Sequence, residues 1–306
     1  MYTTLIAVQT LNGLQLGIIL FLIAAGLTLV FGVMDFINLA HGVQYMVGAY
    51  FAFTFTVLTG SFTLGLLLAL PAALLVGLIL EVLVFRHLYD RDHLEQVLAT
   101  FGIILFLNQG VKVIWGASPL YVPVPELLQG SIEIFEGFFY PVYRLAIIGA
   151  GLGVAALLYF LVSYTRAGML VRAGATNARM VSALGIDIRR LFMVVFGFGA
   201  MLAGFAGAMV APILSVEPGM GDNLLILAFV VIVIGGIGSI RGAFIAALLI
   251  GLVDTLGRGF AGDILRLVMD PSAASQTGRA IAPMLIYILM ALVLIFRPSG
   301  LFPVKR

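Results

Sequence analysis

The chain has 306 residues, of which 62% are hydrophobic and only 10% are charged, and its formal net charge is +2. Soluble domains use roughly 45–50% apolar and about 25% charged residues, so this composition excludes an ordinary soluble protein and predicts a polytopic membrane protein. The small net charge gives no sign of a nucleic-acid partner. The sequence contains no cysteine, which excludes disulfides, thiolate metal sites and a cysteine nucleophile.

Long apolar runs recur along the whole sequence. The first run carries no charge and exceeds the roughly 20 residues that a spanning helix needs. No Lys or Arg precedes Arg86, so we expect this run to stay in the mature chain rather than to act as a cleaved signal peptide. The predicted spans are residues 5–34, 43–58, 62–84, 97–115, 145–163, 192–214, 224–234, 243–256 and 281–296. The seventh and eighth runs are short and could form one re-entrant pair. We therefore predict an all-α polytopic membrane protein with about eight to ten transmembrane or re-entrant helices in a single domain, residues 1–306.

The segments between these runs differ in charge. Residues 116–143 contain four prolines and three glutamates but no Lys or Arg, as expected of a loop outside the membrane. Residues 164–191 contain five arginines against the single Asp187. Positively charged loops are retained on the cytoplasmic side, so we predict an extracytoplasmic N-terminus and a cytoplasmic C-terminus. Most of the 16 lysines and arginines then lie inside, although residues 257–279 place three arginines outside.

The arginine-rich segment, residues 164–191, also carries the pattern of a short helix. Thr176 or Asn177 can cap its start, apolar residues recur on one face, and Gly185 is placed to end it. A helix of about eight residues would be roughly 12 Å long and suited to a groove on a soluble partner. The predicted docking residues are Asn177, the apolar anchors Met180, Val181 and Leu184, the rim residue Arg179, and Gly185. The alternative is a solvated turn whose arginines only set the topology.

Two stretches rich in glycine and polar residues interrupt the spans, at residues 35–42 and 235–242. Broken helices at membrane depth line a cavity or are buried in protein, and paired breaks in a transporter often mark its substrate site. Their positions after the first and sixth runs suggest an internal repeat. The residues predicted to lie near a solute route are Asn38, His41, Gly235, Gly236, Gly238 and Ser239. The alternative is that both stretches are interfacial turns, in which Asn38 and His41 join helices by hydrogen bonds.

Motifs for catalysis are missing from the sequence. No Gly-Lys dipeptide occurs, so the P-loop motif that binds nucleotide phosphates is absent, and the three histidines lack metal-ligand spacing. We therefore predict no catalytic, cofactor or metal residues and no enzymatic activity. The ionisable residues Glu81, Lys112 and Asp254 lie near predicted span ends, and we expect them to reach the membrane interface.

The sequence resembles a known family in several places along its length. Residues 26–33 (GLTLVFGV) and 37–42 (INLAHG) look like the amino-terminal signature of branched-chain amino-acid ABC importer permeases. Further similar stretches are residues 183–186 (ALGI), 235–239 (GGIGS) with Gly242, and 296–302 (FRPSGLF). These stretches span nearly the whole chain in the family's order.

The resemblance implies an inner-membrane permease subunit that translocates a small amino acid of the branched-chain type, or a related organic acid. It implies a second permease subunit, two cytoplasmic ATPase subunits that bind the ATP, and a periplasmic solute-binding protein, with no cofactor on this chain. Residues 164–191 would then be the coupling segment that contacts the ATPase, although residues 176–179 lack the Glu-Ala-Ala core of many importer permeases. The alternatives are a permease of the same family for urea or aromatic acids, or a secondary transporter driven by an ion gradient.

Overall fold

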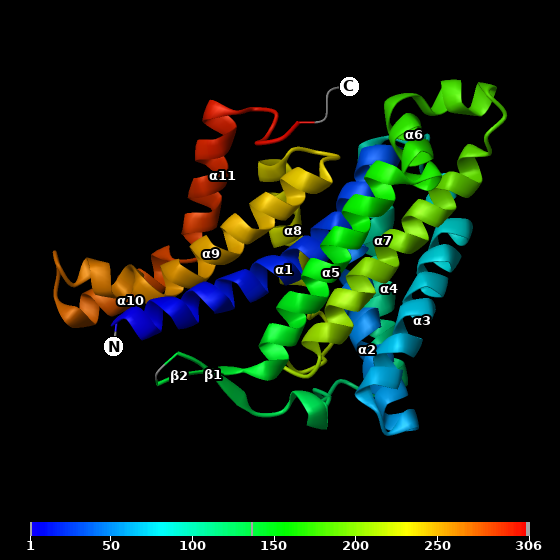
Figure 1. Ribbon diagram of the computed structural model, residues 1–306. Helices are drawn as coiled ribbons and strands as arrows, with labels where there is room; N and C mark the ends of the chain where they lie inside the picture. The colour runs from blue at the N-terminus through cyan, green and yellow to red at the C-terminus, as the bar shows by residue number, and fades with distance from the viewer. Residues whose placement is uncertain (1, 136, 304–306) are drawn as a thin grey trace.

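The computed structural model describes residues 2–303 except residue 136. Most of that part is helical (Figure 1). The α-helices are α1 (Tyr2–Met34), α2 (His41–Thr59), α3 (Phe62–Leu83), α4 (His93–Trp115), α5 (Val142–Tyr164), α6 (Arg166–Ala183), α7 (Ile188–Val210), α8 (Asp222–Gly235), α9 (Ile240–Leu265), α10 (Pro271–Ile281) and α11 (Met284–Phe296). Two 3-10 turns, η1 (Phe85–His87) and η2 (Glu126–Leu128), and a hairpin of β1 (Ser131–Phe135) and β2 (Phe138–Pro141) complete it.

The helices have the length and composition of membrane spans. Among the described residues, six are long and apolar enough to cross a bilayer, namely those at Thr4–Met34, Phe62–His87, His93–Trp115, Val142–Tyr164, Ile188–Val210 and Ile240–Leu265. Helices α10 and α11 together form a further apolar pair, bent by 54°, and α8 is a shorter apolar helix. The predicted all-α polytopic membrane fold is confirmed.

Helix α9 is longer than the sequence predicted. The eighth apolar run was expected to end at residue 256, yet the helix continues to Leu265, and α10 follows within the expected polar linker. Small residues let the extended part of α9 pack against α10, because a Cβ at Gly278 of α10 would lie 2.6 Å from the backbone nitrogen of Gly262. Two helices can pack this closely only where neither has a side chain.

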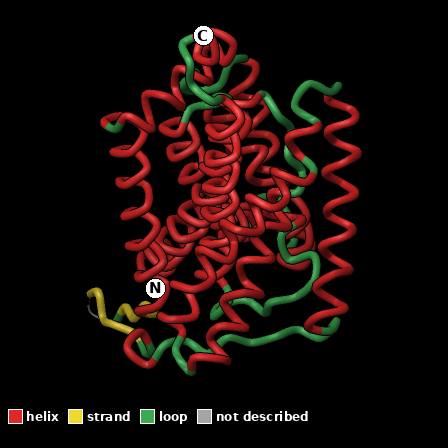
Figure 2. The backbone as a smooth tube through the Cα atoms, turned by 90° about the vertical axis from the view of Figure 1, so that its right-hand side faces the viewer, coloured by secondary structure: helices red, strands yellow, loops and turns green. Residues whose placement is uncertain are grey.

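Helix α1 is the centre of the bundle. Its membrane window is 83% buried, whereas the windows of α4 and α5 are 17% buried and lie at the periphery. Figure 1 shows α1 crossing the molecule obliquely among the other helices, and Figure 2 shows that helices form the body of the molecule. A Cβ at Gly17 would lie 2.8 Å from Cα of Leu248 in α9, and one at Gly26 would lie 2.5 Å from the carbonyl oxygen of Gly199 in α7. The glycines of α1 therefore let it approach two helices at once.

Helix α7 also packs through glycines, as predicted for residues 192–214. A Cβ at Gly48 of α2 would overlap the backbone of Gly204, and one at Gly207 would overlap the carbonyl oxygen of Tyr45. The backbones of α2 and α7 are thus in direct contact over more than one helical turn. The buried residues between α1, α2 and α7 form the main hydrophobic core.

The bundle has two ends of different character (Figure 1). Helix α6 and the C-terminal segment lie at one end, which we call the α6 end. The N-terminus and the β1–β2 hairpin lie at the other. The hairpin is antiparallel, with Ile132 opposite Tyr140, and the preceding loop is held to the segment after α7 by a bridge between Leu120 and Val216. The loop at residues 116–141 is therefore partly structured by backbone pairing.

Candidate coupling segment and solute cavities

Helix α6 consists of two helical pieces that meet at Asn177. The φ and ψ angles of Asn177 are −158° and 89°, which interrupt the helix. Its side-chain oxygen Oδ1 accepts a hydrogen bond from the backbone nitrogen of Met180 at 2.9 Å. Asn177 therefore caps the second piece, and this part of the sequence prediction is confirmed.

Gly185 ends the second piece in the way the sequence predicted. Its φ is +87°, in the left-handed region, and no atom lies within 4 Å of the Cβ position. The Gly185 nitrogen donates to the carbonyl of Ser182 at 2.9 Å, and the Ile186 nitrogen donates to that of Val181 at 3.4 Å. This pair of bonds is a standard helix termination built on a left-handed glycine.

The apolar residues of this piece do not share one face. Met180 and Leu184 are 58% and 74% exposed, while Val181 is only 5% exposed. Residues four apart lie one above the other on a helix, and the next residue along is turned by about 100°. The prediction that Val181 anchors a partner is therefore wrong for this structure, because its side chain faces the body of the protein. Arg179 and the other four arginines of residues 164–191 are exposed.

The first break, residues 35–40, joins α1 to α2 at the α6 end. His41, the buried first residue of α2, lies with its Nε2 atom 3.0 Å from the carbonyl oxygen of Ile23 in α1. The amide of Asn38 is fully buried, and neither of its polar atoms has a hydrogen-bond partner among the described residues. His41 thus joins two helices, which was the alternative role considered for it, while the polar group of Asn38 is unsatisfied.

The second break, residues 236–239, separates α8 from α9 and is covered by the C-terminal segment. The carbonyl oxygens of Ile234 and Gly235 accept hydrogen bonds from the backbone nitrogens of Leu301 and Phe302 at 2.8 and 3.0 Å. These bonds satisfy the carboxyl end of α8, which would otherwise be unpaired. Gly236 has φ +99° and lies against Gly300, so Gly235 and Gly236 are buried beneath the C-terminal segment.

The other two predicted residues of this break line a cavity. Gly238 and Ser239 border a space of about 440 Å³ between α1, α5, α6 and the start of α9, which we call the first cavity. Its lining residues are Thr28, Leu29, Gly32, Val33, Tyr159, Val162, Ser163, Val171, Arg172, Ala175, Thr176, Ile237, Gly238, Ser239, Ile240 and Arg241. Arg172 and Arg241 also line this cavity, although neither was among the residues predicted to lie near a solute route. The position of Arg241 within the glycine-rich stretch at residues 235–242 was the sequence signal available for such a role.

A second space, which we call the α6 groove, also borders α6 and shares the lining residues Gly32, Val33, Ala175 and Thr176 with the first cavity. Its volume is about 840 Å³, and it separates α6 from the segment between α3 and α4. Its charged lining residues are Asp35, Glu81, Arg86, Asp90, Arg179, Asp187 and Arg189. Helix α6 therefore forms one wall of both spaces.

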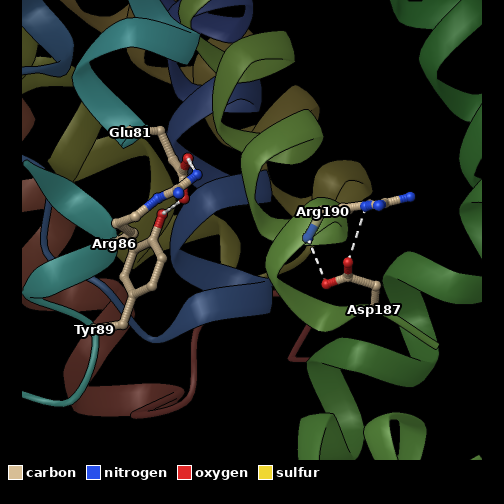
Figure 3. Close-up of polar contacts among 5 residues, drawn as sticks. All are labelled: Glu81, Arg86, Tyr89, Asp187 and Arg190. Atoms are coloured by element: carbon tan, nitrogen blue, oxygen red, sulfur yellow. Dashed lines mark hydrogen bonds and ion pairs between the residues drawn. The ribbon is translucent and has the colours of Figure 1, made fainter. Parts of the chain in front are cut away.

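Glu81 at the edge of the α6 groove is buried, contrary to the sequence prediction. Its side chain is 1% exposed, and its carboxylate accepts hydrogen bonds from Arg86 at 3.0 Å and from the Tyr89 hydroxyl at 3.2 Å (Figure 3). Burial raises the pKa of Tyr89, and the Glu81 charge raises it further, so the phenol stays protonated and donates. Asp254 is similarly enclosed and ion-paired with Arg258 at 2.9 Å. Both carboxylates are neutralised within the protein instead of reaching the interface, whereas Lys112 is exposed.

Arg86→Met is expected to destabilise the protein strongly, because it leaves the buried Glu81 carboxylate without its cation. Removing one partner of a buried pair typically costs about 3–5 kcal/mol, whereas exposed pairs contribute about 0–1 kcal/mol. Thermal unfolding of the detergent-purified protein measures the effect. The matched control is Arg190→Met, which breaks the exposed ion pair with Asp187 at 2.9 Å (Figure 3). Equal unfolding midpoints for the two variants would contradict this account of Glu81.

The arrangement of helices and cavities is typical of membrane transport proteins. A bundle of apolar helices with broken segments, cavities at one end and an exposed arginine-rich helix is a membrane transport protein without metal clusters among its described residues. The comparisons define the family. The family described as branched-chain amino acid transport system / permease component matches residues 9–296, and the chain belongs to it.

Several curated relatives align with the chain over most of its length. It is 31% identical to the high-affinity branched-chain amino acid transport system permease protein BraD of Pseudomonas aeruginosa, covering 96% of this chain and 94% of the relative. It is 29% identical to the corresponding protein LivH of Escherichia coli K12, with the same coverage. Identity to LivM of the same organism is 27%, over 97% of this chain and 71% of LivM. No solved structure matches the chain.

Proposed function

We propose that the chain is a permease subunit of an ATP-driven importer for branched-chain amino acids. Family membership and the relatives BraD and LivH, which are permeases of high-affinity branched-chain amino acid transport systems, support the substrate class. The similarity to both LivH and LivM supports a second, homologous permease subunit as a partner. We further propose that residues 1–306 form a single transmembrane permease domain.

The motor and the solute receptor are separate proteins in this proposal. The sequence lacks a P-loop, so two cytoplasmic ATPase subunits bind and hydrolyse the ATP. A periplasmic binding protein delivers the solute. The chain itself performs no catalysis and binds no cofactor.

The proposed orientation places the α6 end in the cytoplasm of a bacterial inner membrane. The five arginines of residues 164–191 and those of residues 86 and 91 belong to connections at that end, as the positive-inside rule requires. The N-terminus and the β1–β2 hairpin are then periplasmic, and the C-terminus is cytoplasmic. In this orientation α6 faces the ATPase.

The observation that carries the proposal is the surface of α6. Met180 and Leu184 are large apolar residues, one helical turn apart, that are exposed at the end of the protein that contains α6, with Arg179 beside them. Apolar side chains with this spacing fit the groove of a partner protein, and a charged residue at the rim steers the encounter. Asn177 and Gly185 fix the two ends of the second piece of α6, residues 177–185, which we call the coupling piece.

ATP-driven uptake tests the proposal directly. The chain is reconstituted in liposomes with the second permease and the ATPase subunits of its transport system, and the binding protein is added with leucine, benzoate or urea. We expect leucine uptake that requires both ATP and the binding protein. Uptake of urea alone would overturn the substrate class, and uptake by the purified chain alone under a proton or sodium gradient would overturn the ABC mechanism.

A further inference from the structure

The first cavity, between α1, α5, α6 and the start of α9, has the walls of a site for a small apolar molecule. Its volume of about 440 Å³ lies within the range of roughly 300–1,000 Å³ that is usual for small-ligand sites. Its apolar lining residues are Leu29, Val33, Val162, Val171, Ile237 and Ile240. Such walls favour an aliphatic side chain, and the polar groups among them determine what else the site can bind.

The positive charge at the first cavity is not balanced by an acidic residue in the cavity lining. Arg172 and Arg241 both line it, and its lining contains no Asp or Glu. Neither guanidinium forms an ion pair with a carboxylate in the part of the chain that the structure describes. Arg241 lies over the ring of Tyr159, with its Cζ atom 5.0 Å from the ring centre, and donates to the phenol oxygen at 2.9 Å. This contact holds Arg241 in place without neutralising it.

The N-terminus of α9 adds to the same positive potential. The helix begins at Ile240, and Ser239 caps it by accepting a hydrogen bond from the Gly242 nitrogen at 3.1 Å. The first backbone N–H groups of a helix have no partner within the helix and carry a partial positive charge. A helix start beside two arginines is a suitable site for an anion.

Thr28 borders the cavity, but its hydroxyl oxygen is not open to it. Its side chain lines the cavity and is 1% exposed, and its hydroxyl has no hydrogen-bond partner among the described residues. A buried hydroxyl without a partner costs free energy, so such groups are rare unless something else satisfies them. The Thr28 oxygen has almost no accessible surface, so a ligand in the cavity does not reach it in this structure.

We propose that the first cavity binds the carboxylate of a zwitterionic amino acid with an aliphatic side chain. This proposal rests on the proposed function and specifies where the solute is held before it leaves the permease. Arg172, Arg241 and the start of α9 bind the carboxylate, and the apolar walls contact the side chain.

The position of α6 links this site to the motor. Val171, Arg172, Ala175 and Thr176 of α6 form one wall of the cavity, and Met180 and Leu184 lie farther along the same helix, beyond the bend at Asn177. Helix α6 therefore contributes both to the wall of the first cavity and to the surface proposed to face the ATPase.

Protection of a single cysteine tests the site on a chain that has none of its own. Ile237 lines the cavity and is 44% exposed, so Ile237→Cys provides an accessible thiol. The complete transporter, with cysteines removed from its partner subunits, is placed in phosphatidylcholine nanodiscs and treated with a thiol reagent. We expect leucine to slow the labelling and leucinamide, which lacks the carboxylate, to leave it unchanged. In the double variant Ile237→Cys with Arg241→Gln, the leucine concentration that gives half of the maximum protection should rise about tenfold or more. The reason is that the charged hydrogen bond from Arg241 to the leucine carboxylate is lost.

The controls separate this proposal from the proposed function. Arg166→Gln removes an exposed arginine of α6 that does not line the cavity, and it should leave protection intact. If the Ile237→Cys transporter imports leucine but leucine never protects the cysteine, the site is wrong and the function stands. If the wild-type transporter imports no amino acid, the function itself fails. Protection by phosphatidylglycerol in the nanodisc, independent of leucine, would make the cavity a lipid headgroup site and overturn the proposal.

Discussion

Gly48→Leu is expected to abolish the folded form of the protein. A Cβ at this position would overlap the Cα, carbonyl carbon and carbonyl oxygen of Gly204, so the obstacle is backbone that cannot rotate away. Accommodating a leucine requires α2 and α7 to separate, which opens the main core along their shared contact. Ordinary overpacking costs about 1–3 kcal/mol, and the loss of a whole helix contact exceeds that. The measurement is the yield of monodisperse protein on size-exclusion chromatography in detergent.

Gly153→Leu in α5 is the matched control for this variant. Gly153 also lies in a membrane helix, but no atom lies within 4 Å of its Cβ position. Its leucine variant should give the wild-type yield. The reciprocal change, Gly204→Leu, should fail like Gly48→Leu, because a Cβ there meets Ala73 of α3 at 2.6 Å and approaches Gly48. Normal yield and thermal stability of Gly48→Leu would show that α2 and α7 do not pack through these glycines.

These glycines illustrate what a sequence can and cannot predict. The small residues of the sixth run predicted a close approach by another helix, and the approach is present. The partner could not be deduced, because Gly48 is separated from Gly204 by more than one hundred residues and no local pattern connects them. The caps at Asn177 and Gly185 were predicted correctly for the opposite reason, since each acts within one helical turn.

Errors arose where a tertiary contact decides the role of a residue. Glu81 was expected at the interface, but the chain turns after α3 and brings Arg86 and Tyr89 back onto it. Val181 has the same hydrophobicity pattern as its neighbours, yet it faces the body of the protein. The pairing of Leu301 and Phe302 with the end of α8 joins segments more than sixty residues apart. The first cavity depends on four separate segments, so its residues could be collected only from the structure.

Leu184→Asp is expected to eliminate ATP-driven uptake and the co-purification of the ATPase while leaving the permease folded. The residue is 74% exposed and makes no contribution to the core, so an aspartate is tolerated in the isolated protein. When the helix is docked on the ATPase, however, the aspartate places a charge in the apolar groove of that partner. Truncating one buried anchor costs about 1–3 kcal/mol, so Leu184→Ala should weaken assembly more than Arg179→Ala, which removes a rim charge. Leu267→Asp, which changes an 84% exposed residue after α9, should leave ATPase co-purification unchanged.

Gly185 tests the geometry of the coupling piece separately from its surface. At φ +87°, a β-branched residue is strongly disfavoured, although the space around the Cβ position is empty. Gly185→Val should therefore unravel the helix end and move Leu184, reducing uptake and ATPase co-purification without reducing membrane insertion. Gly185→Asn should retain most of both, because asparagine tolerates the left-handed conformation. The asparagine variant thus tests whether the protein needs a left-handed backbone at residue 185 or needs the absence of a side chain there. If Leu184→Asp and Gly185→Val both leave ATPase co-purification and uptake unchanged, residues 164–191 only orient the chain in the membrane.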